Sequence, residues 1–379
     1  MMAILGVAIV PMAHAQVETA APEITARSVY MINADNGEVI YSKNPDDSSA
    51  MASTTKMMTA LLVMENCPDL DSPVTISKRA VEVGESSVWL QEGETLTVRE
   101  LLYGLLVQSG NDAAVALAEY QGGSVETFVE MMNQRAAELG LEQTHFTNPH
   151  GLDDPEHYSS ARDLVVLGGE LMKYPEIRKI VATTEMTIPW AGHPYGRTLV
   201  NHNHLLWQTP AVTGIKTGFT DEAGQCIVVS ASDKGINLLV AYMGGQSLAQ
   251  RDQEVMALLQ YAFDSYRQQK VITKGKEYAD IDIPFRRGEA MALVSDGDLV
   301  KQVYIRDEIE YRVVLPDEMN LPVYQGDKVG LVEAYEGDVY LGNAYLLATQ
   351  DVLKPGWLGR INYLLDSVYH FLLVTAVGG

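Results

Sequence analysis

From residue 53 to residue 64 the chain reads Ser53-Thr54-Thr55-Lys56-Met57-Met58-Thr59-Ala60-Leu61-Leu62-Val63-Met64, a serine and a lysine at the start of an apolar, helix-favouring run. Residues three positions apart are neighbours on one helix face, so the amine of Lys56 is predicted to reach the hydroxyl of Ser53. The positive end of the helix dipole would favour negative charge on that oxygen. This pattern predicts a nucleophile beside a base. The alternative is that Ser53 is an N-cap and Lys56 a solvated first-turn residue.

Two further short motifs follow along the chain. The stretch from Leu96 to Tyr120 has a helical pattern that is broken at Gln108-Ser109-Gly110-Asn111, where Ser, Gly and Asn together favour a turn between two helices. Lys216-Thr217-Gly218 lies in a region of short apolar runs, 213–220, 226–230 and 237–242, which predicts antiparallel strands. The three motifs therefore stand on a helix start, a turn and a strand.

In this order and on these elements, the Ser53-x-x-Lys56, Ser109-Gly110-Asn111 and Lys216-Thr217-Gly218 motifs resemble those of penicillin-binding proteins and class A β-lactamases. The resemblance is to the low-molecular-mass penicillin-binding proteins, which are exported serine-type D-alanyl-D-alanine carboxypeptidases of the peptidase family S11 type, and it covers nearly the whole chain. It implies an α/β (α+β) catalytic domain of the serine β-lactamase and transpeptidase type, with an antiparallel sheet and a helical region. A small all-β domain and a C-terminal amphipathic helix are expected to follow.

The residue types also fit acyl transfer without the family name. A serine hydroxyl is a weak nucleophile unless a base removes its proton, and Lys56 can do this only as a neutral amine. Burial and a second cation, Lys216, would lower the pKa of Lys56 and favour that form. Ser109 is predicted to pass a proton to the leaving amine, and Asn111 to hold either the substrate amide or the Lys56 side chain. We therefore expect Ser53, Lys56, Ser109 and Asn111 to be catalytic.

Substrate contacts are expected along the strand that carries the third motif. Strand alternation places Lys216 and Gly218 on one face, where a glycine would let an extended substrate lie close to the strand edge. Lys216, Thr217 and Arg251 are candidates for binding a terminal carboxylate, because the arginine fork suits a carboxylate. The alternative for Arg251 is a surface position on its helix.

The resemblance adds two substrate-binding positions. It implies an oxyanion hole formed by the backbone N–H groups of Ser53 and Phe219, and it places His150, in the loop Asn148-Pro149-His150-Gly151-Leu152, near the rim of the active site. His150 is expected to bind substrate and not to be catalytic. No cofactor or metal ion is expected, because Asn201-His202-Asn203-His204 is interpreted as a polar turn and its two histidines have no evident third ligand.

The expected reaction is removal of the terminal D-alanine from the peptidoglycan stem peptide through an acyl-enzyme on Ser53, with β-lactam antibiotics binding covalently to the same serine. One alternative is a β-lactamase or esterase on the same fold. It is disfavoured because no Glu-x-x-x-Asn segment follows Asn111 to supply a deacylating glutamate, and because small-molecule hydrolysis does not need a second domain. The middle motif also has Gly110 where class A β-lactamases have Asp. Another is a non-catalytic cell-wall-binding protein that retains the motifs. Phe219 departs from the His or Tyr that relatives often carry.

Composition sets the cellular context. The chain has 379 residues, and 27 basic against 50 acidic residues give a formal net charge of −23, which argues against a nucleic-acid partner. The apolar start and the small-residue pattern Ala13-His14-Ala15 resemble a signal peptide without its usual positive n-region. We therefore expect export to the outer face of the bacterial cytoplasmic membrane, on the periplasmic or cell-wall side. Cys67 and Cys226 form either one disulfide or two buried thiols.

Patterning along the chain predicts a domain order. Asn36-Gly37 between 27–32 and 38–41 predicts a β-hairpin, and helices are predicted over 125–139, 161–173 and 250–266. Later segments alternate as strands, including 278–283, 301–305, 311–315 and 328–334. The resulting assignment is a signal peptide at 1–15, a linker at 16–24, a catalytic domain at 25–268, an all-β domain at 271–354 and a membrane-anchoring helix at 355–379.

The tail has an amphipathic helical pattern. Its apolar face consists of Trp357, Ile361, Leu364, Leu365, Val368, Phe371, Leu372 and Ala376, and Arg360, Asn362, Asp366 and His370 lie on the other face. Such a helix is expected to lie in the membrane interface and not to span it. Because it has few lysines or arginines, binding is expected to depend only weakly on anionic lipid. The alternative is a core helix packed on the β domain.

Overall fold

The structure is a computed structural model that describes residues 20–304 and 308–365. The predicted signal peptide and the last part of the predicted tail lie outside the described residues. The chain divides into two compact units, Met1–Asp264 and Ser265–Gly379. Each unit is described by itself.

The first unit is built on a five-stranded antiparallel sheet in the order β2-β1-β9-β8-β7. Its strands are β1 (Ser28–Asn33), β2 (Val39–Lys43), β7 (Val212–Thr220), β8 (Gly224–Asp233) and β9 (Ile236–Gly245). The predicted Asn36-Gly37 hairpin is confirmed, with Gly37 at φ +78° in the turn where a left-handed backbone is needed. The strands predicted over 213–242 are also confirmed. Within residues 20–304 and 308–365, β7 is an edge strand and has a neighbouring strand on one side only.

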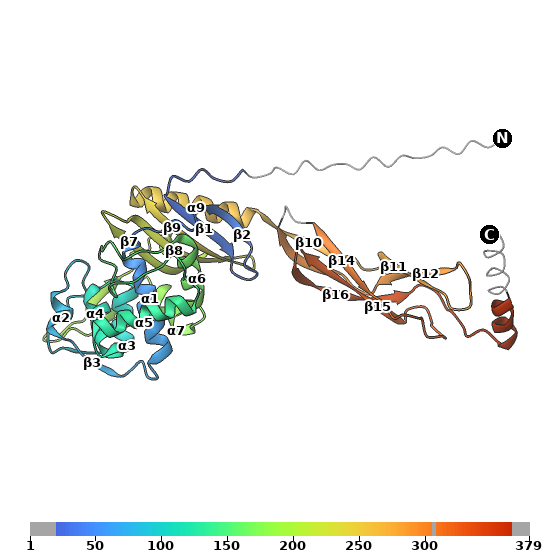
Figure 1. Ribbon diagram of the computed structural model, residues 1–379, viewed down its shortest axis with the longest axis horizontal. Helices are drawn as coiled ribbons and strands as arrows, with labels where there is room; N and C mark the ends of the chain where they lie inside the picture. Colours follow the sequence, from blue (N-terminus) through green and yellow to red (C-terminus); the bar gives the residue numbers. More distant parts are fainter. Residues whose placement is uncertain (1–19, 305–307, 366–379) are drawn as a thin grey trace, which may run out of the picture. The chain divides into compact units, whose positions relative to one another are not determined.

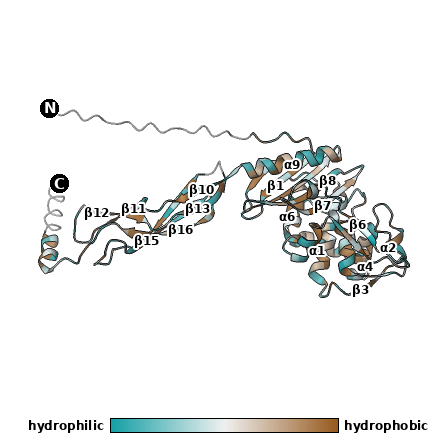
Figure 2. Ribbon diagram, turned by 180° about the vertical axis from the view of Figure 1, so that it is seen from behind, coloured by the Kyte–Doolittle hydropathy of each residue, from teal (hydrophilic) through white to brown (hydrophobic). Residues whose placement is uncertain are grey.

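Helices cover both faces of this sheet (Figure 1). Helix α9 (Leu248–Asp264) packs on β8 and β9, and α6 (Ala161–Leu171) packs on the opposite face against β1 and β9. Figure 2 shows both hydrophobic and hydrophilic bands along α9, as expected of a helix with one face on the sheet and one in water. The helix predicted over 250–266 is therefore confirmed, except that Tyr266 begins the next strand, β10.

The remaining elements of the first unit form the helical region. Helix α1 (Lys56–Asn66) lies at its centre and is buried from Lys56 to Val63, which explains why this segment is apolar on every side. The single-turn 3₁₀ helix η1 (Ala52–Thr55) precedes α1 directly. The other helices of this region are α2 (Lys78–Glu82), α3 (Val98–Leu106), α4 (Asn111–Gly122), α5 (Val125–Glu138), α7 (Pro175–Val181) and α8 (Leu205–Gln208). Two small two-stranded sheets pair β3 (Pro73–Thr75) with β4 (Thr95–Thr97) and β5 (Glu185–Ile188) with β6 (Arg197–Val200). The predicted helices at 125–139 and 161–173 are confirmed.

The second unit is all-β up to its last segment. A five-stranded antiparallel sheet has the order β11-β12-β16-β15-β14, and a two-stranded sheet pairs β10 (Tyr266–Ile272) with β13 (Leu299–Tyr304). The larger sheet consists of β11 (Glu277–Asp282), β12 (Ala290–Ser295), β14 (Ile309–Val314), β15 (Lys328–Glu336) and β16 (Val339–Ala348). Val332, Leu293 and Leu346 are fully buried in its core. The small β domain expected from the alternating pattern is present.

The described part of the tail, residues 357–365, is helical. Its apolar side chains are exposed, from 44% at Ile361 to 71% at Trp357, so this part of the helix is not packed into the β unit as a core helix. Tyr363 and Arg360 contact the ring of Phe285. Within residues 20–304 and 308–365, no helix is long and apolar enough to cross a membrane.

Candidate active site

The nucleophile candidate lies on a 3₁₀ turn and the lysine on the α-helix that follows it. Ser53 belongs to η1 and Lys56 is the first residue of α1, so the two are not on one α-helix as predicted. The predicted contact is nevertheless present, because Lys56 Nζ lies 2.8 Å from Ser53 Oγ. Ala52, directly before Ser53, has a left-handed φ of +49°, a conformation that non-glycine residues rarely adopt outside functional sites.

Lys56 Nζ has three hydrogen-bond partners. Besides Ser53 Oγ, its Nζ contacts Asn111 Oδ1 at 2.7 Å and the carbonyl oxygen of His150 at 2.6 Å. The side chain is fully buried, and burial, followed by the nearby Lys216 cation, holds the pKa of Lys56 well below its ordinary value of 10.5. The lysine is thus oriented toward the serine in an environment that favours the neutral amine.

Lys216 lies on the edge strand β7 and is also buried. Its Nζ donates to the carbonyl oxygen of Thr217 at 2.9 Å. Burial and the Arg251 cation lower the pKa of Lys216 to about 7. Two buried lysines with lowered pKa values in one site are arranged for proton transfer at neutral pH.

The turn between α3 and α4 brings Ser109 and Asn111 to the site. Ser109 is buried and has a left-handed φ of +64°. Asn111 Nδ2 donates to Gly84 O at 3.0 Å, and its backbone N donates to Ser86 O at 2.7 Å. Of the two partners predicted for Asn111, the structure shows the Lys56 side chain.

Gly110 has a local reason to be glycine. A side chain at this position would place its Cβ 2.6 Å from Asp112 Oδ1 and 3.0 Å from a methyl carbon of Val88. The Asp112 carboxylate fills this space and accepts hydrogen bonds from the backbone N of Val88 and Leu90 and from the hydroxyl of Ser87. Asp112 was not identified from the sequence, although its place in the first turn of α4 favours an acidic residue.

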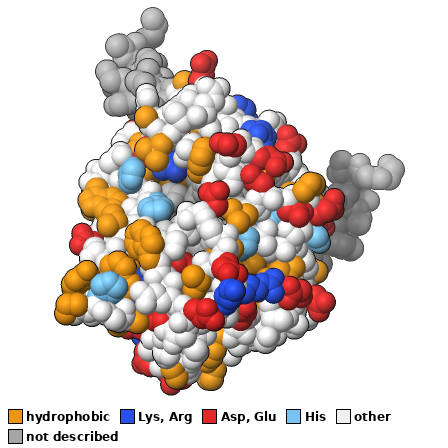
Figure 3. All heavy atoms as spheres, turned by 90° about the vertical axis from the view of Figure 1, so that its left-hand side faces the viewer, with side chains coloured by type: hydrophobic (Ala, Val, Ile, Leu, Met, Phe, Trp, Pro, Cys, Tyr) orange, Lys and Arg blue, Asp and Glu red, His pale blue; other side chains and the backbone are white. Residues whose placement is uncertain are grey.

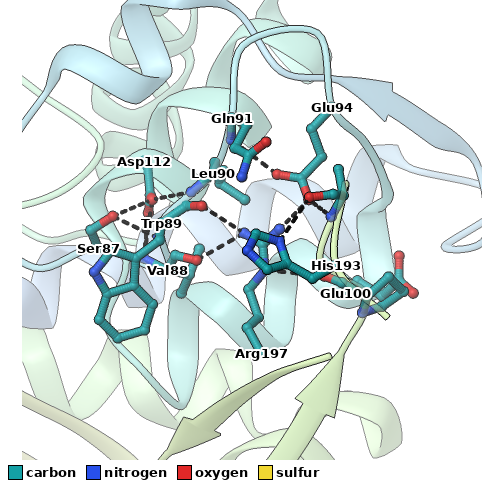
Figure 4. Close-up of polar contacts among 12 residues, drawn as sticks. Ser87, Val88, Trp89, Leu90, Gln91, Glu94, Glu100, Asp112, His193 and Arg197 are labelled. Atoms are coloured by element: carbon teal, nitrogen blue, oxygen red, sulfur yellow. Dashed lines mark hydrogen bonds and ion pairs between the residues drawn. The ribbon is translucent and has the colours of Figure 1, made fainter. Parts of the chain in front are cut away.

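A buried ion pair fixes the same loop from its other end (Figure 4). The guanidinium of Arg197, on β6, pairs with Glu94 and donates to the carbonyl oxygens of Val88 at 2.8 Å and Trp89 at 3.0 Å. Glu94 in turn accepts from the backbone N of Gln91 at 3.0 Å. Together with Asp112, this network holds residues 87–94 beside the site.

Gly218 has a structural role that the sequence did not indicate. A Cβ at this position would lie 3.0 Å from both Met51 O and Ser53 N, so the glycine lets β7 approach the turn that carries the nucleophile candidate. That it also lets an extended substrate lie close to the strand edge stays a prediction. Gly151, at φ +94°, contacts the same turn, and a Cβ there would meet the carbonyl oxygen of Ala52 at 2.0 Å.

His157 contacts η1 through Thr55 and was not identified from the sequence. Its Nδ1 accepts from the backbone N of Thr147 at 3.0 Å, so its Nε2 carries the hydrogen that reaches Thr55 Oγ1 at 2.8 Å. Burial lowers the pKa of His157 to about 4, which keeps this ring neutral at physiological pH.

A cavity of about 350 Å³ opens beside Ser53. Its lining includes the predicted residues Ser53, Ser109, Thr217, Gly218, Phe219 and Arg251, together with Glu85, Ser86, His202, His204, Gln225 and Leu248, which the sequence analysis did not assign to the site. His202 is exposed as a residue, but desolvation of its ring within the cavity wall and the Lys216 cation lower its pKa to about 4. The predicted polar turn at 201–204 is thus part of the cavity wall. Phe219 is 57% exposed at this wall.

Arg251 is a buried residue of the cavity wall, so the alternative of a surface helix position is wrong. Its Nε and Nη2 contact Asp252 Oδ1 at 3.0 and 2.7 Å, and its Nη1 lies 3.4 Å from Gln225 Oε1. This pairing orients the guanidinium. The Asp252 partner is the next residue in the sequence.

The side chain of His150 is not among those that line this cavity. It faces a second cavity, with Lys78 and Arg79, and its Nδ1 accepts from Leu152 N at 3.2 Å. Burial and the Lys56 cation lower the pKa of His150 to about 3. His150 contacts the site through its backbone carbonyl oxygen, which accepts a hydrogen bond from Lys56 Nζ.

Cys67 and Cys226, for which the sequence allowed either a disulfide or two thiols, are free buried thiols.

On the face shown in Figure 3, acidic side chains are more widespread than basic ones. Among the residues that the structure describes, no group of three or more His, Cys, Asp or Glu side chains is arranged to hold a metal ion.

A serine on a 3₁₀ turn, within hydrogen-bond distance of a buried lysine and beside an antiparallel edge strand, is the arrangement expected of a serine hydrolase. The family profile described as D-alanyl-D-alanine carboxypeptidase, Peptidase_S11, matches residues 15–247. The chain is 34% identical to D-alanyl-D-alanine carboxypeptidase DacF of Bacillus subtilis, over 88% of this chain and 87% of the relative. It is 31% identical to DacA of Escherichia coli, over 92% and 89%. The chain therefore belongs to the D-alanyl-D-alanine carboxypeptidase family.

Solved structures agree with this assignment. Penicillin binding protein 5 from Haemophilus influenzae is similar with a TM-score of 0.64 and 31% identity, covering 88% of this chain and 99% of that one. The Streptomyces K15 DD-transpeptidase has a TM-score of 0.62 and 33% identity, covering 65% and 99%. The predicted family and fold class are confirmed, and the protein is a serine-type peptidase.

Proposed function

We propose that the protein removes the terminal D-alanine from peptidoglycan stem peptides through an acyl-enzyme on Ser53, and that β-lactam antibiotics acylate the same serine. The observation that carries this proposal is the 2.8 Å contact between Lys56 Nζ and Ser53 Oγ in a buried site. Family membership and the D-alanyl-D-alanine carboxypeptidase relatives support the substrate class.

Acylation begins when neutral Lys56 accepts the proton of Ser53 Oγ. The oxygen attacks the carbonyl carbon between the last two D-alanines, and the resulting oxyanion accepts hydrogen bonds from the backbone N–H groups of Ser53 and Phe219. The contact of Ser53 N with the Gly218 position, one residue before Phe219, supports this pair of donors. When the C–N bond breaks, Ser109 passes a proton from Lys56 to the departing amine of D-alanine.

Deacylation uses the same residues with water as the nucleophile. Lys56 takes a proton from water, hydroxide adds to the acyl carbon, and the bond to Ser53 Oγ breaks. The serine oxygen recovers its proton from Lys56, and the product leaves as a shortened peptide with a new carboxylate. The hydrogen bonds from Lys56 to Asn111 and His150 O keep the amine in place through both halves of the reaction.

Lys216, Thr217 and Arg251 are proposed to bind the terminal carboxylate of the substrate. Arg251 lines the cavity with Ser53, and its pairing with Asp252 leaves Nη1 only a 3.4 Å contact to Gln225, so that this end of the fork is available to a ligand. The carboxylate of a β-lactam would occupy the same position. In this assignment His150 orients Lys56 through its main chain and does not bind the substrate with its ring.

The proposal is tested by covalent labelling with a fluorescent penicillin. Ser53→Ala should lose labelling and keep a native thermal melt, because one hydroxyl is removed from a packed turn. Lys56→Ala should slow acylation by orders of magnitude, and Lys56→Arg should not restore it because a guanidinium stays protonated. Persistent stoichiometric labelling of Ser53→Ala, or recovery by Arg, would contradict the assignment. Release of D-alanine from a D-Ala-D-Ala peptide separates a carboxypeptidase from a β-lactamase and from a non-catalytic penicillin binder.

The protein is also proposed to be exported and attached to the outer face of the cytoplasmic membrane by its tail. The exposed apolar side chains of residues 357–365 support this placement, since a helix with one apolar and one polar face is suited to lie in a lipid interface. The apolar start with its Ala13-His14-Ala15 pattern supports export.

A further inference from the structure

The active-site cavity contains one carboxylate that the proposed reaction does not use. Glu85 is the single acidic residue among the described residues that line it, and in the described part of the chain no lysine or arginine forms an ion pair with it. Its side chain is exposed to the solvent that fills the cavity. A carboxylate left in this position is available to a ligand.

The backbone holds Glu85 in an unfavourable conformation. Its φ is +61°, in the left-handed region where glycine is the usual residue, and the preceding Gly84 is at φ +78°. The two flanking carbonyl oxygens, of Gly84 and Ser86, both accept hydrogen bonds from Asn111. A glycine would satisfy this turn without strain, so the backbone alone does not account for a glutamate at this position. Non-glycine residues with a left-handed backbone conformation are found more often at functional sites than elsewhere.

The same asparagine connects Glu85 to the chemistry. Asn111 Oδ1 accepts from Lys56, so the segment that carries Glu85 is fixed relative to the base that activates Ser53. Glu85, Ser86 and Ser109 come from the helical region, whereas Thr217, Gly218 and Arg251 come from the sheet and α9. The cavity thus has a cationic group on its sheet side and an anionic group on its helical side.

In the proposed function, a substrate bound through its terminal carboxylate to Arg251 extends past Ser53 toward the helical side of the same cavity. Glu85 repels carboxylates and attracts ammonium groups there. We infer that Glu85 binds a free primary ammonium on the side chain of the residue that precedes D-Ala-D-Ala, so that the enzyme prefers stem peptides with an unmodified diamino acid at that position. This inference rests on the proposed function. Peptides in which that amine is acylated or cross-linked are poorer substrates.

The test uses two peptides that differ only in this charge, Nα-acetyl-L-Lys-D-Ala-D-Ala with a free ε-amine and the same peptide with the ε-amine acetylated. D-Alanine release gives kcat/KM for each peptide with the full-length protein, Glu85→Gln and Glu85→Gly. The control is Glu92→Gln, which removes an exposed carboxylate from the same loop outside the cavity. The wild-type protein should prefer the free amine by roughly three- to tenfold, the range expected for a partly solvated charge pair.

In Glu85→Gln and Glu85→Gly this ratio should fall to about one, and Glu92→Gln should keep it. Raising the ionic strength should also reduce the wild-type ratio, because salt screens exposed charges. Glu85→Gly removes the left-handed strain as well, so its thermal melt should not be lower than that of the wild type, which shows that the loop is intact.

An unchanged ratio in Glu85→Gln, including equal losses on both peptides, overturns the inference and leaves the proposed function standing. If the wild-type protein is labelled by penicillin at Ser53 and does not distinguish the two peptides, the inference is also wrong. If it neither labels at Ser53 nor releases D-alanine from either peptide, the proposed function fails and the inference falls with it. Labelling of every variant is therefore measured alongside turnover.

Discussion

Asn111 is the residue that joins Lys56 to the loop at Gly84. Its Oδ1 lies 2.7 Å from Lys56 Nζ, and its Nδ2 lies 3.0 Å from Gly84 O. An amide is the side-chain group that accepts at one end and donates at the other without carrying charge. A substitution here therefore affects the protonation of the base and the position of the cavity wall together.

Substitutions of Asn111 should separate these two effects. In Asn111→Asp a carboxylate beside Lys56 stabilises the ammonium, raises the pKa of the lysine and so moves the rising limb of the acylation rate to more alkaline pH. Asn111→Ala leaves Lys56 without this acceptor and should be slow, by about 10²-fold, at every pH. The rate of penicillin acylation between pH 6 and 10 measures both. Identical pH profiles for the two variants would contradict this role of the amide.

The buried amine of Lys216 should make stability depend on pH. Its pKa is about 7 in the folded protein and close to its ordinary value of 10.5 when unfolded, so between these pH values the unfolded chain binds more protons. The contribution of this residue to the free energy of unfolding therefore rises with pH. Lys216→Met, which cannot be charged, should raise the melting temperature more at pH 6 than at pH 9.

The matched control for this measurement is Lys234→Met, at a lysine whose side chain is 71% exposed. The difference between this variant and the wild type should not change in the same way with pH. A Lys216→Met effect that is constant from pH 6 to 9 would show that the lysine does not lose its proton in the folded protein.

Arg251 should distinguish free acids from esters. Arg251→Ala is expected to weaken turnover of a peptide with a free terminal carboxylate far more than turnover of its methyl ester, with a loss of roughly 2–4 kcal/mol in transition-state stabilisation for the acid. Arg251→Lys should not restore activity, because one ammonium cannot serve Asp252 and the substrate together. The measurement is kcat/KM of each variant on the free acid and on its methyl ester. Equal losses of turnover on the acid and the ester would mean that Arg251 only supports the cavity wall through Asp252. Arg162→Ala, which removes a cation paired with Asp46, is the control for the change in net charge.

Removal of the tail should release an active enzyme. Deleting residues 356–379 should move the protein from the membrane fraction to the soluble fraction without lowering turnover of a small peptide, because the site is formed within the first unit. A less disruptive variant is Leu364→Glu with Leu365→Glu, which places charge on the exposed apolar face, and Asn362→Glu on the polar face is its control. Membrane retention of the truncated protein, or its unfolding, would contradict the anchor.

The contacts of the site that could be predicted from the sequence are those between residues close together in the chain. Ser53 and Lys56 are three positions apart, so the local backbone of η1 and the first turn of α1 is enough to bring them together, although the two do not share one α-helix. Support from His150 O could not be predicted, because every residue has a carbonyl group and only the fold selects this one. Asp112 and Glu85 were missed for a similar reason, since their roles depend on where a loop of the helical region is fixed. The Asp252 partner of Arg251 is adjacent in the sequence and could have been recognised as a neighbouring opposite charge.

Gly218 shows a different limit. Strand alternation correctly places it on the face of Lys216, but alternation does not say what lies opposite that face. In the structure Ser53 N and Met51 O lie where a Gly218 side chain would be, a contact between distant parts of the chain that the strand pattern could not indicate. The fold class and the order of strands and helices were accessible because each depends on periodicity and turn residues within a short stretch.

The turn that carries Ser53 is enclosed by two glycines, Gly151 and Gly218, which leave no space for a side chain on either side. The exposed positions Glu85, Phe219 and Leu248 at the cavity wall have no such constraint, so substitutions there are expected to change peptide preference and to leave the turn in place. A larger residue at either glycine is instead expected to displace Ser53, and so to lower turnover of the peptide and acylation by a β-lactam together.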